Sequence, residues 1–211
     1  MAKVPVAGNV KTRLARQIGT SEAVRFYRAT SSAVIGRLAR QPFWETIIAV
    51  SPDAGAQGCQ GRIWPRGIKR AAQGGGDLGN RMQRPMRRLA PGPVCVVGTD
   101  VPGITVALVR RAFRLLGNRT IVFGPAADGG FWLVGQRRRT RLVEPYAKVR
   151  WSHPETLADV LGNIERGPDG AARVGFTGQL HDVDEVADLV HTRGQFGRRI
   201  PPPNTGSEAK C

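Results

Sequence analysis

Cysteine is scarce in this chain of 211 residues, with only Cys59, Cys95 and Cys211 and no closely spaced pair among them. An odd count without a pairing motif predicts neither a disulfide framework nor a zinc cage. No apolar stretch approaches the roughly 18 residues of a membrane span, and the chain does not open on a charged segment followed by an apolar run. We therefore expect a soluble cytoplasmic protein without a membrane span.

Acidic residues are also few, because 16 aspartates and glutamates stand against 32 lysines and arginines and leave a formal charge of +16. Such an excess favours an anionic partner: nucleic acid, an anionic membrane or a phosphorylated small molecule. The alternative is that many arginines lie on solvated helix faces. Aromatic residues make up only 6% of the chain and are not interleaved with basic runs such as "QRRRTRL" (136–142). Because stacking platforms are therefore missing, a nucleic-acid or anionic-surface binding protein is the competing hypothesis rather than the leading one.

The length of the chain fits one compact domain, since single domains commonly run to about 100–200 residues. The composition changes near residue 192, where "TRGQFGRRIPPPNTGSEAKC" is rich in glycine, proline and small polar residues. We expect a single domain over residues 1–191 and a basic, disordered tail over 192–211.

Short apolar runs alternate with segments of helical periodicity along the domain. Strands are predicted within 44–51, 94–100, 119–126, 130–136 and 172–180, and helices over about 21–40, 105–116, 153–165 and 184–191. Ser152 and Glu155 form the S-x-x-E pattern of a capping box at the third helix. The segments 54–61 and 73–82 are expected as loops. This alternation indicates an α/β domain with a mostly parallel sheet, in which ligands bind beyond the carboxyl ends of the strands.

The stretch "GNVKTRLARQIG" (8–19) is basic and begins with a glycine. Gly8 permits a tight backbone, and Lys11 and Arg13 are placed to reach one anionic group from an irregular loop. A helix follows soon after, and the exposed N–H groups of a helix start favour phosphate. The spacing of a Walker loop is absent. From the residues alone, a phosphate-binding loop and a solvated basic face remain alternatives.

Carboxylates follow two of the predicted strands. Asp100 ends the apolar run "VCVVGTD", and the "VPG" after it turns the chain away, so that the carboxylate faces the cleft. In "HDVDE" (181–185), Asp182 and Asp184 project to the same side of an extended segment. Together the three would hold a magnesium ion that also takes phosphate oxygens. The alternatives are a loop-bracing role for Asp100 and a helix-capping role for Asp184.

Two glycine-rich segments add candidate ligand contacts. "QGGGDLGNRM" (73–82) offers backbone groups for close approach beside Gln73, and "AADGGF" (126–131) places Asp128 before two glycines. Either segment alone is also compatible with an ordinary turn.

The segments "KVPVAGNVKTRLA", "QGGGDLGNRM", "GTDVPGI", "GPAADGGFWLVG", "WS" and "LHDVDE" occur in the order of a bacterial family. Over about residues 1–190 the chain resembles the GT-A-type radical-SAM/selenodomain-associated transferases, also called arsenosugar-biosynthesis glycosyltransferases. That family is similar to the guanylyltransferases that activate phospholactate or phosphoenolpyruvate, which share a K-x-R-L start, a D-x-P turn and a glutamine/glycine loop that reads the base. The resemblance implies a nucleotide-diphospho-sugar transferase (GT-A) fold, with the nucleotide in the N-terminal half and the acceptor in the C-terminal half.

The resemblance also implies roles for individual residues. Nucleotide contacts are expected at Gly8, Lys11, Arg13, Gln73, Gly76, Leu78 and Thr99. The ligands of Mg²⁺ (or Mn²⁺) are expected to be Asp100, Asp182 and Asp184, and the acceptor pocket is expected to be shaped by Asp128, Gly129 and Gly130. Catalysis is assigned to Lys11, Arg13 and Asp100, which act mostly by positioning and electrostatics.

Three departures from the family's pattern bear on these roles. Phe131 and Trp132 stand where the family often has a tyrosine pair, so any hydroxyl contact made there is lost. Glu185 replaces the usual threonine after the D-V-D motif. Only "MAKVPVA" precedes Gly8, where family members begin with an apolar strand, so we expect a shortened first strand.

The leading hypothesis is a metal-dependent transferase that uses a nucleotide-activated donor, with glycosyl transfer from a nucleotide sugar to a small acceptor favoured. The close alternative is nucleotidyl transfer from a nucleoside triphosphate to a small phosphorylated acceptor, in which the acceptor attacks the α-phosphorus and pyrophosphate leaves. A family member without turnover is a third hypothesis.

Overall fold

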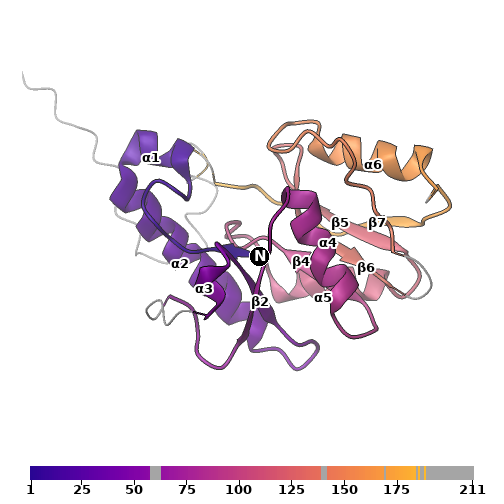
Figure 1. Ribbon diagram of the computed structural model, residues 1–211, viewed down its shortest axis with the longest axis horizontal. Coiled ribbons are helices and arrows are strands. Elements are labelled where there is room, and N and C mark those ends of the chain that lie inside the picture. The colour runs from indigo at the N-terminus through magenta and orange to yellow at the C-terminus, as the bar shows by residue number, and fades with distance from the viewer. Residues whose placement is uncertain (58–62, 139–141, 169, 184, 186–187, 189–211) are drawn as a thin grey trace, which may run out of the picture.

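The computed structural model describes residues 1–57, 63–138, 142–168, 170–183, 185 and 188 (Figure 1). The strands in this part of the chain are β1 (Ala2–Lys3), β2 (Ile47–Ser51), β3 (Lys69–Ala72), β4 (Val94–Val97), β5 (Ile121–Pro125), β6 (Phe131–Gln136) and β7 (Val174–Phe176). The helices are α1 (Thr12–Ile18), α2 (Thr20–Ala39), α3 (Ala54–Gln57), α4 (Leu78–Arg88), α5 (Val106–Leu115) and α6 (Thr156–Arg166). In this part of the chain, no helix combines the length and the apolar character needed to cross a membrane.

The strands form two sheets that meet at Met1. The first sheet has the order β1-β2-β3 and is parallel throughout, and the second has the order β4-β6-β5-β7. Within the second sheet β6 runs antiparallel to β4 and β5, whereas β5 and β7 are parallel. The Met1 amino group donates to the carbonyl of Val97, and the Met1 carbonyl accepts from the Thr99 hydroxyl at 3.1 Å. These bonds place the short first strand beside β4.

Helices cover both faces of the second sheet, as the alternation of side chains along β5 shows. Ile121 and Phe123 are buried in one cluster with residues of α4 and α6. Val122, which lies between them, is buried in a second cluster with residues of α2 and α5. Because successive side chains of a strand point to opposite faces, the two clusters lie on opposite sides of the sheet. The predicted α/β fold with a mostly parallel, doubly covered sheet is confirmed.

Several elements lie where the sequence predicts them. α2 covers nearly the whole predicted span, and its buried residues fall on one face. The Thr105 hydroxyl accepts from the Leu108 N–H at 3.3 Å and caps α5, as its position before an apolar helix indicates. The segments 119–126 and 130–136 form the β5–β6 hairpin, with "ADGG" as its turn.

Other elements differ from the expectation. β3 and α4 are unexpected, and α4 begins at Leu78 inside the segment predicted as a loop. α3 occupies part of the predicted loop 54–61, and α1 begins at Thr12, so that Arg13 lies in a helical turn. β7 is shorter than the predicted strand. Most of the predicted last helix (184–191) and the whole tail (192–211) fall outside the described residues.

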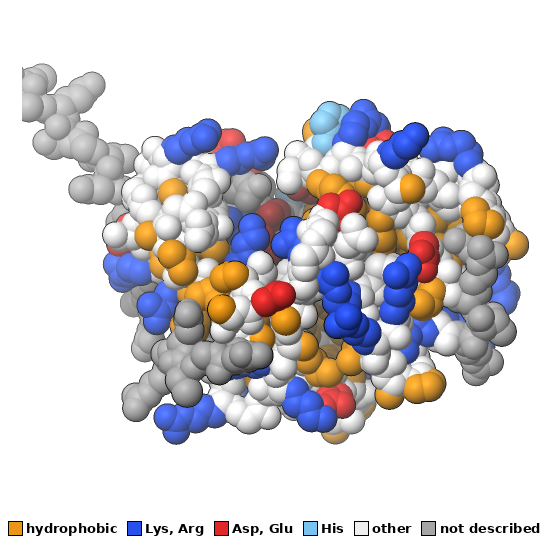
Figure 2. Space-filling view, in the orientation of Figure 1, with side chains coloured by type: hydrophobic (Ala, Val, Ile, Leu, Met, Phe, Trp, Pro, Cys, Tyr) orange, Lys and Arg blue, Asp and Glu red, His pale blue; other side chains and the backbone are white. Residues whose placement is uncertain are grey.

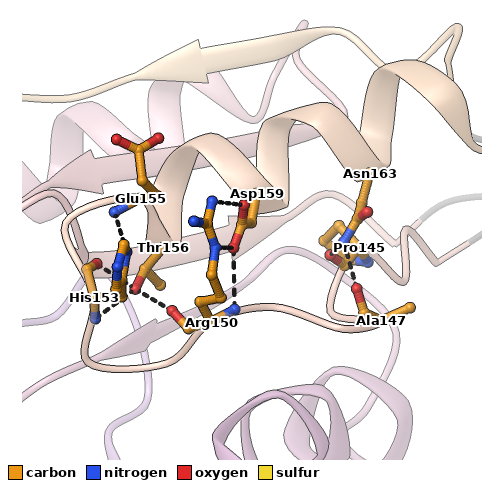
Figure 3. A network of polar contacts seen from close by, with 8 residues as sticks. All are labelled: Pro145, Ala147, Arg150, His153, Glu155, Thr156, Asp159 and Asn163. Atoms are coloured by element: carbon orange, nitrogen blue, oxygen red, sulfur yellow. Dashed lines mark hydrogen bonds and ion pairs between the residues drawn. The ribbon is translucent and has the colours of Figure 1, made fainter.

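The predicted capping box at α6 is wrong. Ser152 has φ 57°, in the left-handed region, rather than the extended backbone that an N-cap side chain needs, and α6 begins at Thr156. The Thr156 hydroxyl instead lies 2.7 Å from the carbonyl oxygens of both Arg150 and His153 (Figure 3). Nδ1 of His153 accepts from the Glu155 N–H at 3.1 Å. His153, predicted in the first turn of the helix, therefore lies in the loop before it.

Arg150 ties this loop to α6 through Asp159. Its Nε and Nη2 atoms donate to the two carboxylate oxygens of Asp159 at 2.9 and 2.6 Å, and its backbone N–H donates at 3.0 Å (Figure 3). Because these hydrogen bonds favour the ionised carboxylate, they lower the pKa of Asp159 to about 2. We expect an NMR titration of the Asp159 carboxyl to give this midpoint, and Arg150→Gln to return it toward the ordinary value of about 3.9.

The lowered pKa also fixes the sign of the pH dependence. The pKa of Asp159 is lower in the folded than in the unfolded protein, so its ion pair stabilises the fold above about pH 4 and loses this effect as the pH falls through the folded value. Asp159→Asn should therefore lower the midpoint of urea unfolding at neutral pH, and this difference should shrink under strongly acidic conditions. An Asp159 midpoint near pH 4 in the wild-type protein would contradict this account.

Candidate functional site

The structure brings together a lysine and two aspartates from three distant segments. The Lys11 ammonium lies 2.8 Å from Oδ1 of Asp182 and 3.2 Å from Oδ2 of Asp100. The side chain of Lys11 is 4% exposed, against 39% for Asp100 and 19% for Asp182. Figure 2 shows the surface hollowed between the half that carries α1 and the half that carries α6, with acidic side chains at depth. We call Lys11, Asp100 and Asp182 the charged triad.

Lys11 reaches the aspartates from an unusual backbone position. It precedes α1 with φ 45° and ψ 50°, a left-handed conformation that is uncommon for residues other than glycine. Its carbonyl already accepts the first helical bond, from the Ala15 N–H at 2.9 Å. The hydroxyl of Tyr27 on α2 accepts from the Lys3 N–H at 2.8 Å, and this hydrogen bond joins α2 to β1. Burial is the main cause that raises the pKa of this phenol, which therefore stays neutral.

Asp100 follows β4, as predicted, and the turn after it is held by α2. Arg37 donates to the carbonyls of Pro102, at 3.3 Å, and Ile104. Burial alone would raise the pKa of Asp100, but the charge of Lys11 and its hydrogen bond outweigh this effect and lower the pKa below its usual value. Asp100 is therefore a carboxylate at neutral pH.

Asp182 is held by its neighbours in the last described segment. Its Oδ1 accepts from the Val183 N–H at 2.6 Å as well as from Lys11. Val183 is completely buried, whereas the side chain of Asp182 is partly exposed. Asp184, the predicted third metal ligand, lies outside the described residues.

The donor set of the triad suits a hard divalent cation. One ammonium already contacts an oxygen of each carboxylate, which shows that a single cation can reach both. Within the described ranges, no three histidine, cysteine, aspartate or glutamate side chains gather into one cluster. Mg²⁺ usually binds through one or two carboxylates, substrate phosphates and water, so two aspartates from the protein meet its needs.

The D-G-G turn of the β5–β6 hairpin (128–130) lies next to the triad. Hydrogen bonds on each side of this turn join the hairpin to the two segments that lead to Asp100 and Asp182. The Gly98 N–H donates to the Trp132 carbonyl at 2.9 Å, which sets the start of β6 beside the segment that leads to Asp100. On the other side, the Ala127 N–H donates to the Leu180 carbonyl at 2.9 Å, two residues before Asp182. The predicted acceptor segment therefore adjoins both aspartates.

Within this turn, Asp128 is exposed and Gly129 is closely packed. Oδ1 of Asp128 accepts from the Gly130 N–H at 2.9 Å. Gly129 has φ +85°, and a Cβ atom there would lie 1.8 Å from the carbonyl oxygen of Pro154. The Gly129 carbonyl accepts from the Leu157 N–H at 2.9 Å. The turn is thus fixed against the start of α6.

The loop before α4 (73–77) is largely exposed, and hydrogen bonds hold its backbone in place. Arg84 donates to the carbonyls of Gln73 and Gly75, the latter at 2.9 Å, and the Gly74 N–H donates to Asp53 at 2.9 Å. Gly76 has φ +95°, and the exposed side chain of Leu78 follows it at the start of α4. Gly76 and Leu78 are therefore accessible to a ligand, and their predicted contact with a base stays a prediction.

Gln73 and Thr99 have structural partners that the sequence did not indicate. The buried amide of Gln73 donates to the carbonyls of Ala2, at 3.1 Å, and Ala49, at 2.9 Å. Thr99 is buried and bonds to Met1. These two side chains hold the first strands together beneath the site, whereas Gly8 and Arg13 are exposed at its edge. Nucleotide contacts by all four residues stay predictions.

Sequence reasoning missed the residues that brace the site. Arg37 donates to a carbonyl 65 residues later, Arg84 to carbonyls 11 and 9 residues earlier, and Asp53 accepts from a backbone N–H 21 residues later. Surface arginines are numerous in this chain, and no spacing distinguishes these two from the others. Only the folded backbone reveals their partners.

Comparison with known proteins gives two positive findings. Residues 34–153 match the model of a family described as "Uncharacterized protein conserved in bacteria (DUF2064)". The fold is similar to the crystal structure of a "putative nucleotide-diphospho-sugar transferase" from Desulfovibrio desulfuricans G20, with a TM-score of 0.80 and 27% identity over 94% of this chain and 86% of that chain. This similarity confirms the predicted GT-A-like fold. No curated protein has significant sequence similarity to the chain.

Proposed function

This chain belongs to the DUF2064 family, and from its site we propose that it is a metal-dependent transferase that uses a nucleotide-activated donor. The observation that carries the proposal is the charged triad, in which the ammonium of Lys11 contacts the carboxylates of Asp100 and Asp182. The name of the Desulfovibrio protein supports a nucleotide sugar as the donor. The finer family suggested by the sequence motifs, with its link to arsenosugar synthesis, remains a hypothesis.

In this proposal, catalysis depends mainly on how the metal and the basic side chains are placed around the phosphates of the donor. Asp100 and Asp182 would hold the divalent cation, which when bound neutralises the diphosphate of the donor. Lys11, and Arg13 in the first turn of α1, would contact the same phosphates as negative charge develops on the leaving group. Each group that stabilises the charge developing in the transition state typically raises the catalytic rate by about 10²–10³-fold. Asp128 and the adjoining glycines would orient the acceptor beside the reacting carbon.

Nucleotidyl transfer is the second candidate, because the same residues would serve it. The bound metal and Lys11 would neutralise phosphate oxygens whichever bond breaks, and the glycine-rich loop with exposed Leu78 would contact the base in either reaction. The two reactions differ in their products: glycosyl transfer releases a nucleoside diphosphate, whereas nucleotidyl transfer releases pyrophosphate.

A thermal-shift screen tests the proposal directly. Nucleotide sugars and nucleoside triphosphates are each added with and without Mg²⁺, because a ligand that binds only the folded protein raises its melting temperature by mass action. We expect an upward shift that needs both a nucleotide and the metal. A screen in which no nucleotide shifts the transition, or in which Mg²⁺ makes no difference to any shift, would overturn the proposal.

A further inference from the structure

Lys11 stands where a metal would have to bind. Its ammonium contacts one oxygen of Asp100 and one of Asp182, the two carboxylates that we assign to the divalent cation. Its side chain is more buried than that of either aspartate. The lysine therefore lies at the inner side of the pair and neutralises part of the negative charge that would attract a metal.

A metal and the Lys11 ammonium cannot both keep these contacts. Mg²⁺ binds oxygen at about 2.0–2.1 Å, whereas the ammonium lies 2.8 and 3.2 Å from the same carboxylates. If both were present, the ammonium and a doubly charged ion would lie within a few ångströms of each other in a partly buried site, where their repulsion is weakly screened. A metal that binds Oδ2 of Asp100 and Oδ1 of Asp182 therefore has to displace the ammonium from these oxygens.

The donor supplies a place for the lysine to go. Lys11 directly precedes α1, and its stem of four carbons with rotatable bonds lets the ammonium move while the backbone stays in place. The phosphates of a nucleotide donor offer oxygens of the same charge as the aspartates. A transfer of Lys11 from carboxylate to phosphate would keep the ammonium paired and free the aspartates for the metal.

We propose that Lys11 is an internal counter-ion that blocks the metal site until donor phosphates draw it away. This inference rests on the proposed function, because it assumes that Asp100 and Asp182 bind the metal. The proposed role of Lys11 predicts that the metal binds weakly without the nucleotide. It also predicts that the nucleotide and the metal strengthen each other's binding. Because such coupling is reciprocal, the lysine that repels free metal is the group that favours the metal–nucleotide pair.

Binding of Mn²⁺ without nucleotide tests the proposal, with free Mn²⁺ measured by its EPR signal. Lys11→Met removes the competing cation, so we expect it to bind Mn²⁺ at least about tenfold more tightly than the wild type. Lys11→Arg keeps the charge and should bind Mn²⁺ as weakly as the wild type. Arg16→Met removes an exposed charge from the same helix and should change the affinity less than twofold. Equal affinity of Lys11→Met and the wild type would overturn the proposal.

Two further measurements separate this inference from the proposed function and from misfolding. Adding Asp100→Asn to Lys11→Met should abolish the gained Mn²⁺ binding; if it does not, the metal site itself, and with it the proposed function, is wrong. Lys11→Met leaves two carboxylates without their cation and is expected to be less stable. Mn²⁺ should then raise its melting temperature by more than it raises that of the wild type, and an equal shift in both proteins would count against the counter-ion role.

Discussion

Asp100→Asn is expected to abolish the magnesium-dependent stabilisation by nucleotides and to lower turnover by at least about 100-fold. The amide has nearly the same shape as the carboxylate, so the packing against Gly98 is preserved. A Cβ atom added at Gly98 would lie 3.2 Å from Oδ1 of Asp100. What the substitution removes is the charge. A neutral oxygen leaves the metal with one aspartate from the described site and removes one of the carboxylates that pair with Lys11. The change is measured by thermal shift and by release of nucleoside diphosphate.

Glu45→Gln is the matched control for this experiment. Glu45 is an exposed carboxylate that pairs with Lys69 at 2.7 Å, so its change removes the same charge and one ion pair on the surface. Such fully exposed ion pairs contribute little to stability. Glu45→Gln should retain the nucleotide shift. If Asp100→Asn retains it equally, Asp100 is not a metal ligand.

Gly129→Ala is expected to lower the free energy of unfolding by about 3–5 kcal/mol, because it combines a steric clash with a strained backbone. The added Cβ would lie 1.8 Å from the carbonyl oxygen of Pro154, and the φ of +85° is unfavourable for alanine. Backbone atoms of the loop before α6 would have to move, and with them the turn that carries Asp128. Urea unfolding gives the loss of stability.

Gly67→Ala separates the clash from the backbone strain. Gly67 has nearly the same φ, +79°, but no atom lies within 4 Å of its Cβ position. The left-handed backbone alone should then cost about 1–2 kcal/mol. The difference between the two variants measures the contact with Pro154. Similar losses in both would mean that the loop yields easily and does not fix the turn.

The elements that the sequence predicts well are those with strong apolar patterns. α2, α5 and the β5–β6 hairpin bury regular sets of side chains, so their periodicity is visible in the sequence. β3 reads "KRAA" and is largely exposed, so it has no apolar pattern to detect. α4 is rich in arginine and contains Pro85, which is usually a sign that a helix ends. Its packing against the sheet through Met82 and Met86 outweighs that local signal.

The site was predictable as a set of residues but not as an arrangement. Strand ends and glycine-rich turns indicated Asp100, Asp182 and Asp128, because polar residues at such positions serve ligands more often than packing. The sequence assigned Lys11 to phosphate and the aspartates to metal, and nothing in it indicated that they contact one another. That contact depends on the left-handed backbone at Lys11 and on long-range packing, neither of which a local pattern encodes.

The bond between Lys11 and Asp182 joins residues 171 positions apart, so the site has a consequence for how the protein is made. A ribosome completes α1, the first sheet and the β5–β6 hairpin before it adds the segment that carries Asp182. A domain generally folds as a unit, and bringing together residues that are far apart in the sequence has an entropic cost that local structure does not share. The charged triad can therefore form only after Asp182 has been added, when the described strands and helices that precede it have already been synthesised. If the triad binds the donor as proposed, a shorter chain that lacks the segment with Asp182 should not bind it.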